Sequence, residues 1–208
     1  MTGMEEVFIS LCNRLGVKEP EIHWKILSSY YAESTRRYHT IDHIERVWLE
    51  FDKHRHELDW ETPVEWAIFW HDAFYSTKVS DGANVSMSAH MALVAIAHKS
   101  PEFRVRVEDL ILATDHIGQS TFQDAEFMCD FDLVILGQSE EDYNAYSKAI
   151  RQEYSWVPLD EYRAKRVKIL QDILDRGQVF YTSPYRQKYE LAARKNLARE
   201  IKTLIGEV

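Results

Sequence analysis

Apolar and polar positions along the 208 residues alternate with the period of helices rather than strands. Ala67, His71 and Phe74 fall on one stripe at the i, i+4, i+7 spacing of a helix, which places His71 on an inward face. Strand-like alternation occurs only around Val179 to Tyr181. The pattern predicts nine or ten helices, over residues 5–15, 21–33, 41–56, 62–75, 84–98, 102–116, 124–136, 140–154, 160–176 and 186–205.

Several of these helices carry end signals. Gly16 and Gly177 are typical of helix C-termini, and Thr40 is a candidate N-cap. Thr62 is the clearest candidate N-cap, because Pro63 follows at the first helical position and Glu65 stands three residues after the cap. Residues 76–83 are the best loop candidate. We therefore expect an all-α fold.

The composition supports this expectation. Only 7 Gly and 5 Pro occur, while 45% of the residues are hydrophobic and 28% are charged. Such a mixture buries a core readily and favours helices joined by short loops. The aromatic residues Trp66, Phe69, Trp70 and Phe74 spread around one predicted helix, so we expect them in the core rather than in a base-stacking platform.

The formal net charge of -9 argues against a nucleic-acid partner, because an acidic surface repels phosphate backbones. A small phosphorylated substrate stays compatible, since a bound dication reverses the local charge. We see no signal peptide and no apolar run that could cross a membrane. Cys12 and Cys129 read as buried thiols of a reducing compartment, so a cytoplasmic location is expected. A homo-oligomer remains open.

Three sequence features suggest a metal site. His71 and Asp72 are adjacent, His39 directly precedes a predicted helix, and Asp132 lies between the apolar residues Phe131 and Leu133. An acid in such surroundings is costly to bury unless it is paired or bound to a metal. Imidazole and carboxylate ligands together suit Mn, Fe, Co, Ni or Zn.

Longer stretches carry a resemblance. The segments Arg37 to Ile44, Phe69 to Tyr75 and Asp130 to Gly137, with Ile150 to Tyr154 and Glu190 to Leu197, resemble predicted metal-dependent phosphohydrolases of the HD-domain superfamily. The resemblance spans about residues 30–200. It implies one HD-type helical domain over residues 1–208, an HD-domain helical bundle with its core at about 30–155 and additional C-terminal helices at about 159–205.

The resemblance also implies site roles. His39, His71, Asp72 and Asp132 match the metal ligands of the family, with one divalent ion among Mn, Co, Ni, Fe, Zn and Mg. A metal-activated water would hydrolyse a phosphate ester such as a nucleotide or another small phosphorylated metabolite. Asp72 and His43 are the expected catalytic residues. The expected substrate contacts are Arg37, His43, Asn84 and His116.

Some assignments stay open at this point. Asp130 is an alternative to Asp132 as a ligand, and a second ion would use His90, His98 or His116. Further cations that could bind a phosphate are Arg36, Lys78 and Arg151. For Lys78, a charge exposed to solvent is the favoured interpretation.

Three competing functions follow from the same residues. Where the family tends to carry Asn-Glu-Glu, this chain has Asn84-Val85-Ser86, which favours a catalytically silent HD-fold protein that binds metal or nucleotide for regulation. A site with two irons would instead indicate an HD-type oxygenase. The last alternative is a helical scaffold without an active site.

Overall fold

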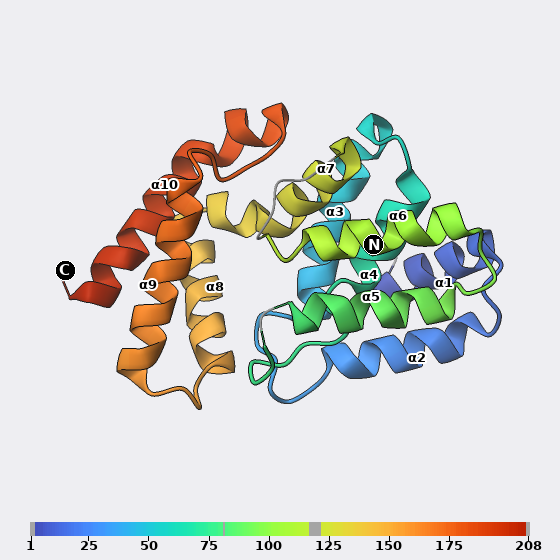
Figure 1. Ribbon diagram of the computed structural model, residues 1–208, viewed down its shortest axis with the longest axis horizontal. Helices are drawn as coiled ribbons and strands as arrows, with labels where there is room; N and C mark the ends of the chain where they lie inside the picture. The colour runs from blue at the N-terminus through green and yellow to red at the C-terminus, as the bar shows by residue number, and fades with distance from the viewer. Residues whose placement is uncertain (1–2, 81, 117–121, 207–208) are drawn as a thin grey trace. The chain divides into compact units, whose positions relative to one another are not determined.

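The computed structural model describes residues 3–80, 82–116 and 122–206, and this part of the chain is all-helical, without a strand (Figure 1). The α-helices are α1 (Met4–Leu15), α2 (Pro20–Tyr31), α3 (Ile41–His54), α4 (Glu61–Trp70), α5 (Ala83–Ala95), α6 (Pro101–Ala113), α7 (Gln123–Leu133), α8 (Glu140–Glu153), α9 (Leu159–Asp175) and α10 (Ser183–Ile205). Two short 3-10 helices are η1 (Arg55–Glu57) and η2 (Val134–Gly137). The expected all-α fold is confirmed.

The helices group into two compact units, Met1–Phe131 and Asp132–Val208. Helix α7 belongs to the first unit up to Phe131, and its last two residues begin the second. This grouping does not test whether the chain folds as one domain with a core at about 30–155, so that expectation stays a prediction.

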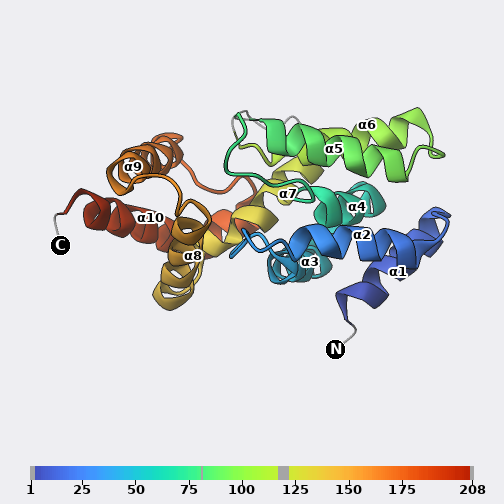
Figure 2. The same cartoon turned by 90° about the horizontal axis from the view of Figure 1, so that it is seen from below.

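The first unit is built around α4. Every residue of α4 from Pro63 to Trp70 is buried, because α1, α3, α5 and α6 pack around it. Helices α5 and α6 lie side by side in both views (Figures 1 and 2). The ring of Phe8 in α1 lies 5.0 Å from that of Phe69 and 5.7 Å from that of Trp66. The expected core positions of Trp66, Phe69 and Trp70 are confirmed, whereas Phe74 is only half-buried and lies in the turn after α4.

The second unit is built around α10, which packs against α9 and η2. The Asn196 amide in α10 donates hydrogen bonds to the carbonyls of Leu136 and Gln138 and so fixes η2 on the helix. The buried Arg166 of α9 pairs with Glu200 of α10, with 2.9 Å between Nε and Oε1.

Helix α4 differs at both ends from the predicted range 62–75. It begins at Glu61 because the buried carboxylate of Asp124 in α7 accepts hydrogen bonds from the backbone N–H groups of Asp59 and Trp60, each at 2.9 Å. Thr62 is therefore not the N-cap. The helix ends at Trp70, so His71 to Tyr75 lie in the following turn. The Asp124 carboxylate of a distant helix thus holds the two residues before α4, and no side chain among the described residues caps the first turn of that helix.

Other helix ends fall short of the predicted ones. Helix α5 stops at Ala95 rather than residue 98, α6 at Ala113 rather than 116, and α7 at Leu133, after which η2 covers the predicted remainder to 136. Residues 179–181 form no strand, because the N–H groups of Val179 and Phe180 donate to the Glu190 carboxylate instead. Within the predicted loop 76–83, residue 81 lies outside the described residues.

Candidate metal centre

Three helices of the chain each bring part of a histidine and aspartate cluster. His43 stands in the first turn of α3, His71 directly follows the last residue of α4, and Asp72 is next in the turn. Asp132 is the penultimate residue of α7. His43 and His71 are each only 1% exposed, whereas the Asp72 side chain is 16% exposed. The carboxylate therefore lies at the margin of the buried histidine pair.

The polar atoms of His43, His71 and Asp72 form a small triangle within the first unit. The two Nε2 atoms lie 3.1 Å apart. Oδ2 of Asp72 is 3.2 Å from Nε2 of His71 and 3.4 Å from Nε2 of His43. Three ligand-type atoms thus converge on one point from two segments of the chain.

The orientation of the His71 ring is set by the helix that precedes it. Its Nδ1 lies 2.8 Å from the carbonyl oxygen of Ile68 and can act only as a donor there. In the neutral imidazole this leaves Nε2 without a proton and with its lone pair directed at the triangle. A backbone carbonyl on the outer nitrogen is the usual partner of a metal-binding histidine.

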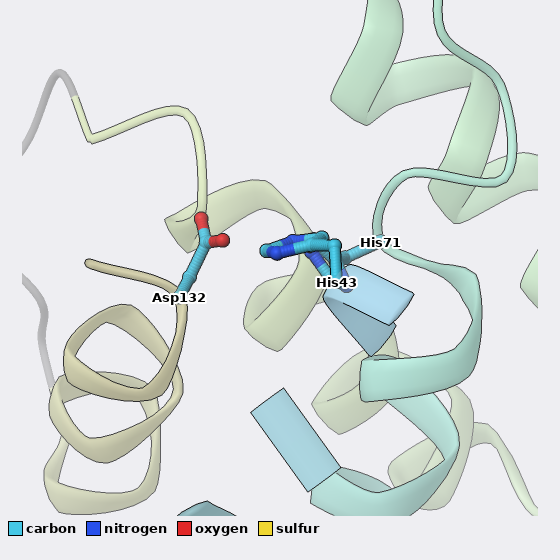
Figure 3. Close-up of side chains that lie close together, drawn as sticks. All are labelled: His43, His71 and Asp132. Carbon is cyan, nitrogen blue, oxygen red and sulfur yellow. The ribbon is translucent and has the colours of Figure 1, made fainter. Parts of the chain in front are cut away.

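Asp132 supplies a further carboxylate. Its ligand oxygen lies within 4.8 Å of the ligand nitrogens of His43 and His71, and this is the group that could hold a metal ion among the described residues. Figure 3 shows the side chains of His43 and His71, which lie close together in the first unit. Asp132 follows Phe131 within α7 and is the first residue of the second unit. Asp72 is outside this group, although its Oδ2 lies 3.2 Å and 3.4 Å from the Nε2 atoms of His71 and His43.

The separations test whether a metal fits. With metal–ligand bonds of about 2.1 Å, neighbouring ligands are about 3.0 Å apart in an octahedron and about 3.4 Å in a tetrahedron. The edges of 3.1, 3.2 and 3.4 Å lie within this range. Two imidazole nitrogens and two carboxylates are also a donor set that first-row divalent ions accept. The residues fit a divalent ion.

The surroundings keep Asp72 ionised. Burial alone would raise the pKa of this carboxyl, but the nearby imidazoles of His71 and His39 and a hydrogen bond from His43 hold its pKa well below the usual range. An ionised carboxylate is the form that binds a cation.

His39 lies beside the triangle rather than in it. Its ring stacks on that of Tyr75, with centroids 4.0 Å apart, and lies 5.8 Å from the ring of His43. The group at the candidate site contains His43 and not His39. The sequence predicts His39 as a ligand and His43 as a catalytic and substrate-binding residue, and the ligand role of His39 stays a prediction.

The expected substrate contacts occupy different environments. Arg37 is exposed and donates to the carbonyls of Ser34 and Arg36, while Asn84 closes the following loop through two hydrogen bonds to the backbone of Ser76. His116 has a left-handed backbone, with φ of 55°, at the end of a described segment. The roles of these residues toward a substrate stay predictions.

The remaining candidate cations and ligands are mostly engaged elsewhere. Arg151 donates to the carbonyls of Tyr154 and Val157 at the end of α8, and Lys78 is exposed. His90 is exposed, and Nε2 of His98 lies 3.0 Å from the Leu15 carbonyl. Asp130 is fully buried and is not in the group at the candidate site.

Two features of the site have weak sequence signals. His43 stands one turn after His39, and only the fold decides which ring meets His71. The sequence offers Arg36 as a cation for a phosphate. In the structure its buried guanidinium donates instead to the backbone carbonyls of His39, Asp72 and Ala73. No local sequence pattern predicts such long-range contacts.

Comparison with protein-family models, with curated proteins and with solved structures finds no match for the chain. None of the described helices combines the length and apolar character needed to cross a bilayer.

Proposed function

We propose that the chain is a metal-dependent phosphohydrolase whose ion is held by His43, His71, Asp72 and Asp132. The observation that carries the metal centre is the triangle of two Nε2 atoms and one carboxylate oxygen, with edges of 3.1–3.4 Å. The reaction class is supported by the resemblance of residues 30–200 to HD-domain phosphohydrolases.

The histidines and carboxylates would have different roles in catalysis. A divalent ion bound there would lower the pKa of a water and stabilise negative charge on a phosphoryl group. Asp72 directs Oδ2 at both histidines, so its other oxygen is available to orient a water by a hydrogen bond. The 1% exposure of both histidines keeps their lone pairs from bulk water.

The proposed substrate is a small phosphate ester, with a nucleoside monophosphate as the first candidate. Arg37 is exposed close to His39 in sequence and supplies a cation for the phosphate. The net charge of -9 disfavours long nucleic acids but leaves a small anion acceptable once a dication is bound.

The test is phosphate release from a panel of nucleoside monophosphates and other small phosphate esters, with Mn²⁺, Co²⁺, Ni²⁺, Zn²⁺ or Mg²⁺ supplied. We expect metal-dependent release that His71→Ala abolishes and that His90→Ala, which alters an exposed histidine, leaves unchanged. Hydrolysis that is equal in His71→Ala and the parent protein would overturn the proposal.

One observation favours the catalytically silent alternative. The Asn84 amide is engaged with the Ser76 backbone, and hydrophobic Val85 and neutral Ser86 stand where the family carries acids. This alternative predicts one bound ion without phosphate release from any ester in the panel. Two irons per chain would instead indicate the redox alternative.

A further inference from the structure

Arg36 connects the segment before α3, which leads to His43, with the turn after α4, which carries His71 and Asp72. Its Nη1 donates to the carbonyl oxygens of Asp72 at 2.7 Å and His39 at 3.2 Å, and its Nη2 donates to the carbonyl of Ala73 at 2.9 Å. Its Nε donates to the Glu33 carboxylate at 3.1 Å. The guanidinium therefore binds the segment leading into α3 and the turn leaving α4 at the same time.

Two aromatic rings flank this guanidinium. Its Cζ lies 5.1 Å from the ring centroid of Tyr31 and 5.6 Å from that of Tyr75. Tyr31 is itself anchored, since its hydroxyl donates to the Phe69 carbonyl in α4 at 2.8 Å. Tyr75 stacks in turn on His39. The two rings restrict the space in which the guanidinium can move.

The contacts also require arginine rather than another cation. A planar fork with five donors reaches carbonyls on two segments at fixed angles, whereas a lysine ammonium offers a single point of contact. The Arg36 side chain is fully buried, and burying a cation is costly unless its donors are satisfied. Its position is therefore explained by what it holds in place.

We propose that Arg36 is a positioning residue of the metal centre, which sets the separation of His43 from His71 and Asp72. This inference rests on the proposed metal-dependent function. By binding the Asp72 and Ala73 carbonyls, the guanidinium draws the chain out of the helix after Trp70. The Asp72 side chain then turns toward His43 on the next segment, where Oδ2 reaches Nε2 at 3.4 Å.

The experiment compares Arg36→Lys with the parent protein, using Co²⁺ alone as the probe. The control is Arg14→Lys, which alters an arginine that joins α1 to α4 through the Glu65 side chain and contacts neither ligand-bearing segment. We measure the Co²⁺ dissociation constant, the visible spectrum of bound Co²⁺, and the amide hydrogen exchange of residues 70–76 without metal.

We expect Arg36→Lys to weaken Co²⁺ binding by about 10- to 100-fold, the usual effect of losing a residue that orients metal ligands. Its Co²⁺ spectrum should change, and the amides of residues 70–76 should exchange faster. Arg14→Lys should reduce thermal stability and leave both metal readouts unchanged.

The outcomes separate this inference from the proposed function. Parent-like affinity, spectrum and exchange in Arg36→Lys would overturn the positioning role and leave the metal centre standing. A parent protein that binds no Co²⁺ would overturn the metal centre and the positioning role toward it, while the exchange data would still decide whether Arg36 holds the turn.

Discussion

At the scale of single residues, the central question is which histidine of the segment before and within α3 binds the ion. His43 has its Nε2 at 3.1 Å from that of His71, whereas the His39 ring is stacked on Tyr75. We therefore predict that His43→Ala lowers Co²⁺ affinity by about a hundredfold or more, since each of four ligands contributes roughly 3 kcal/mol. His39→Ala should lower it by about tenfold or less.

Isothermal titration of both variants with Co²⁺ checks this prediction. A larger loss of Co²⁺ affinity in His39→Ala than in His43→Ala would contradict this prediction. It would indicate that His39 binds the ion and that His43 does not.

The candidate site was only partly predictable at this scale. The sequence indicates three of the candidate ligands. His71 and Asp72 are a histidine next to an acid, and Asp132 is an acid between apolar residues, which is costly to bury unless it is paired or bound to a metal. No sequence signal distinguishes His39 from His43 as a ligand, since both lie on the same segment four residues apart. In the structure the His39 ring stacks on Tyr75, whereas Nε2 of His43 lies 3.1 Å from Nε2 of His71.

At the scale of elements, Gly137 shows how closely η2 approaches α10. A Cβ atom added at Gly137 would lie 2.6 Å from Cβ of Tyr189 and 3.0 Å from its carbonyl oxygen. The obstacle includes backbone, which cannot move aside without displacing α10. We predict that Gly137→Ala lowers the free energy of unfolding by about 1–3 kcal/mol, as overpacking does elsewhere.

Chemical denaturation followed by circular dichroism measures this change. Gly3→Ala is the control, because nothing lies within 4 Å of an added Cβ there. Equal stability of the two variants would show that η2 and α10 are not packed as described.

The pair of Arg166 and Glu200 makes the second unit sensitive to acid. Burial alone would raise the pKa of Glu200, but Arg166 and hydrogen bonds including that from Tyr143 hold its pKa below the ordinary value of 4.5. Because the folded pKa is lowered, the stabilisation is complete above pH 4.5 and is lost as pH falls through the folded pKa.

We therefore predict a fall in the free energy of unfolding below about pH 4.5 that is shallower in Glu200→Gln. Glu140→Gln, which alters an exposed carboxylate paired with Arg199, should keep the slope of the parent protein. Denaturation curves at a series of pH values give the slopes, and identical slopes in all three proteins would contradict the role of Glu200.

Helix existence was predictable from the sequence, and helix ends were less so. Gly16 closes α1 in a left-handed conformation, as its residue type indicates. The ends of α4 depend instead on Asp124 and Arg36, which lie far away in the chain. A local pattern contains the period of a helix but not the distant groups that satisfy its terminal N–H and C=O groups.

At the scale of the whole molecule, the ten α-helices of the described residues form two units with different kinds of interior. The first encloses the aromatic cluster of α4 and presents His71 and Asp72 directly after that helix. The second contains a buried ionic network centred on Glu200. The all-α class followed from periodicity and from the scarcity of Gly and Pro, whereas the division at Phe131 runs within a continuous helix and leaves no mark in the sequence.

The central claim is that the chain holds a divalent ion at His43, His71, Asp72 and Asp132. Elemental analysis of protein purified without chelator, beside an Asp72→Ala variant, tests it most directly. The account predicts about one divalent transition ion per chain in the parent protein and a loss of most of it in the variant. Equal metal content in both, or no ion in the parent after Mn²⁺, Co²⁺, Ni²⁺, Zn²⁺ and Mg²⁺ are supplied, would contradict it.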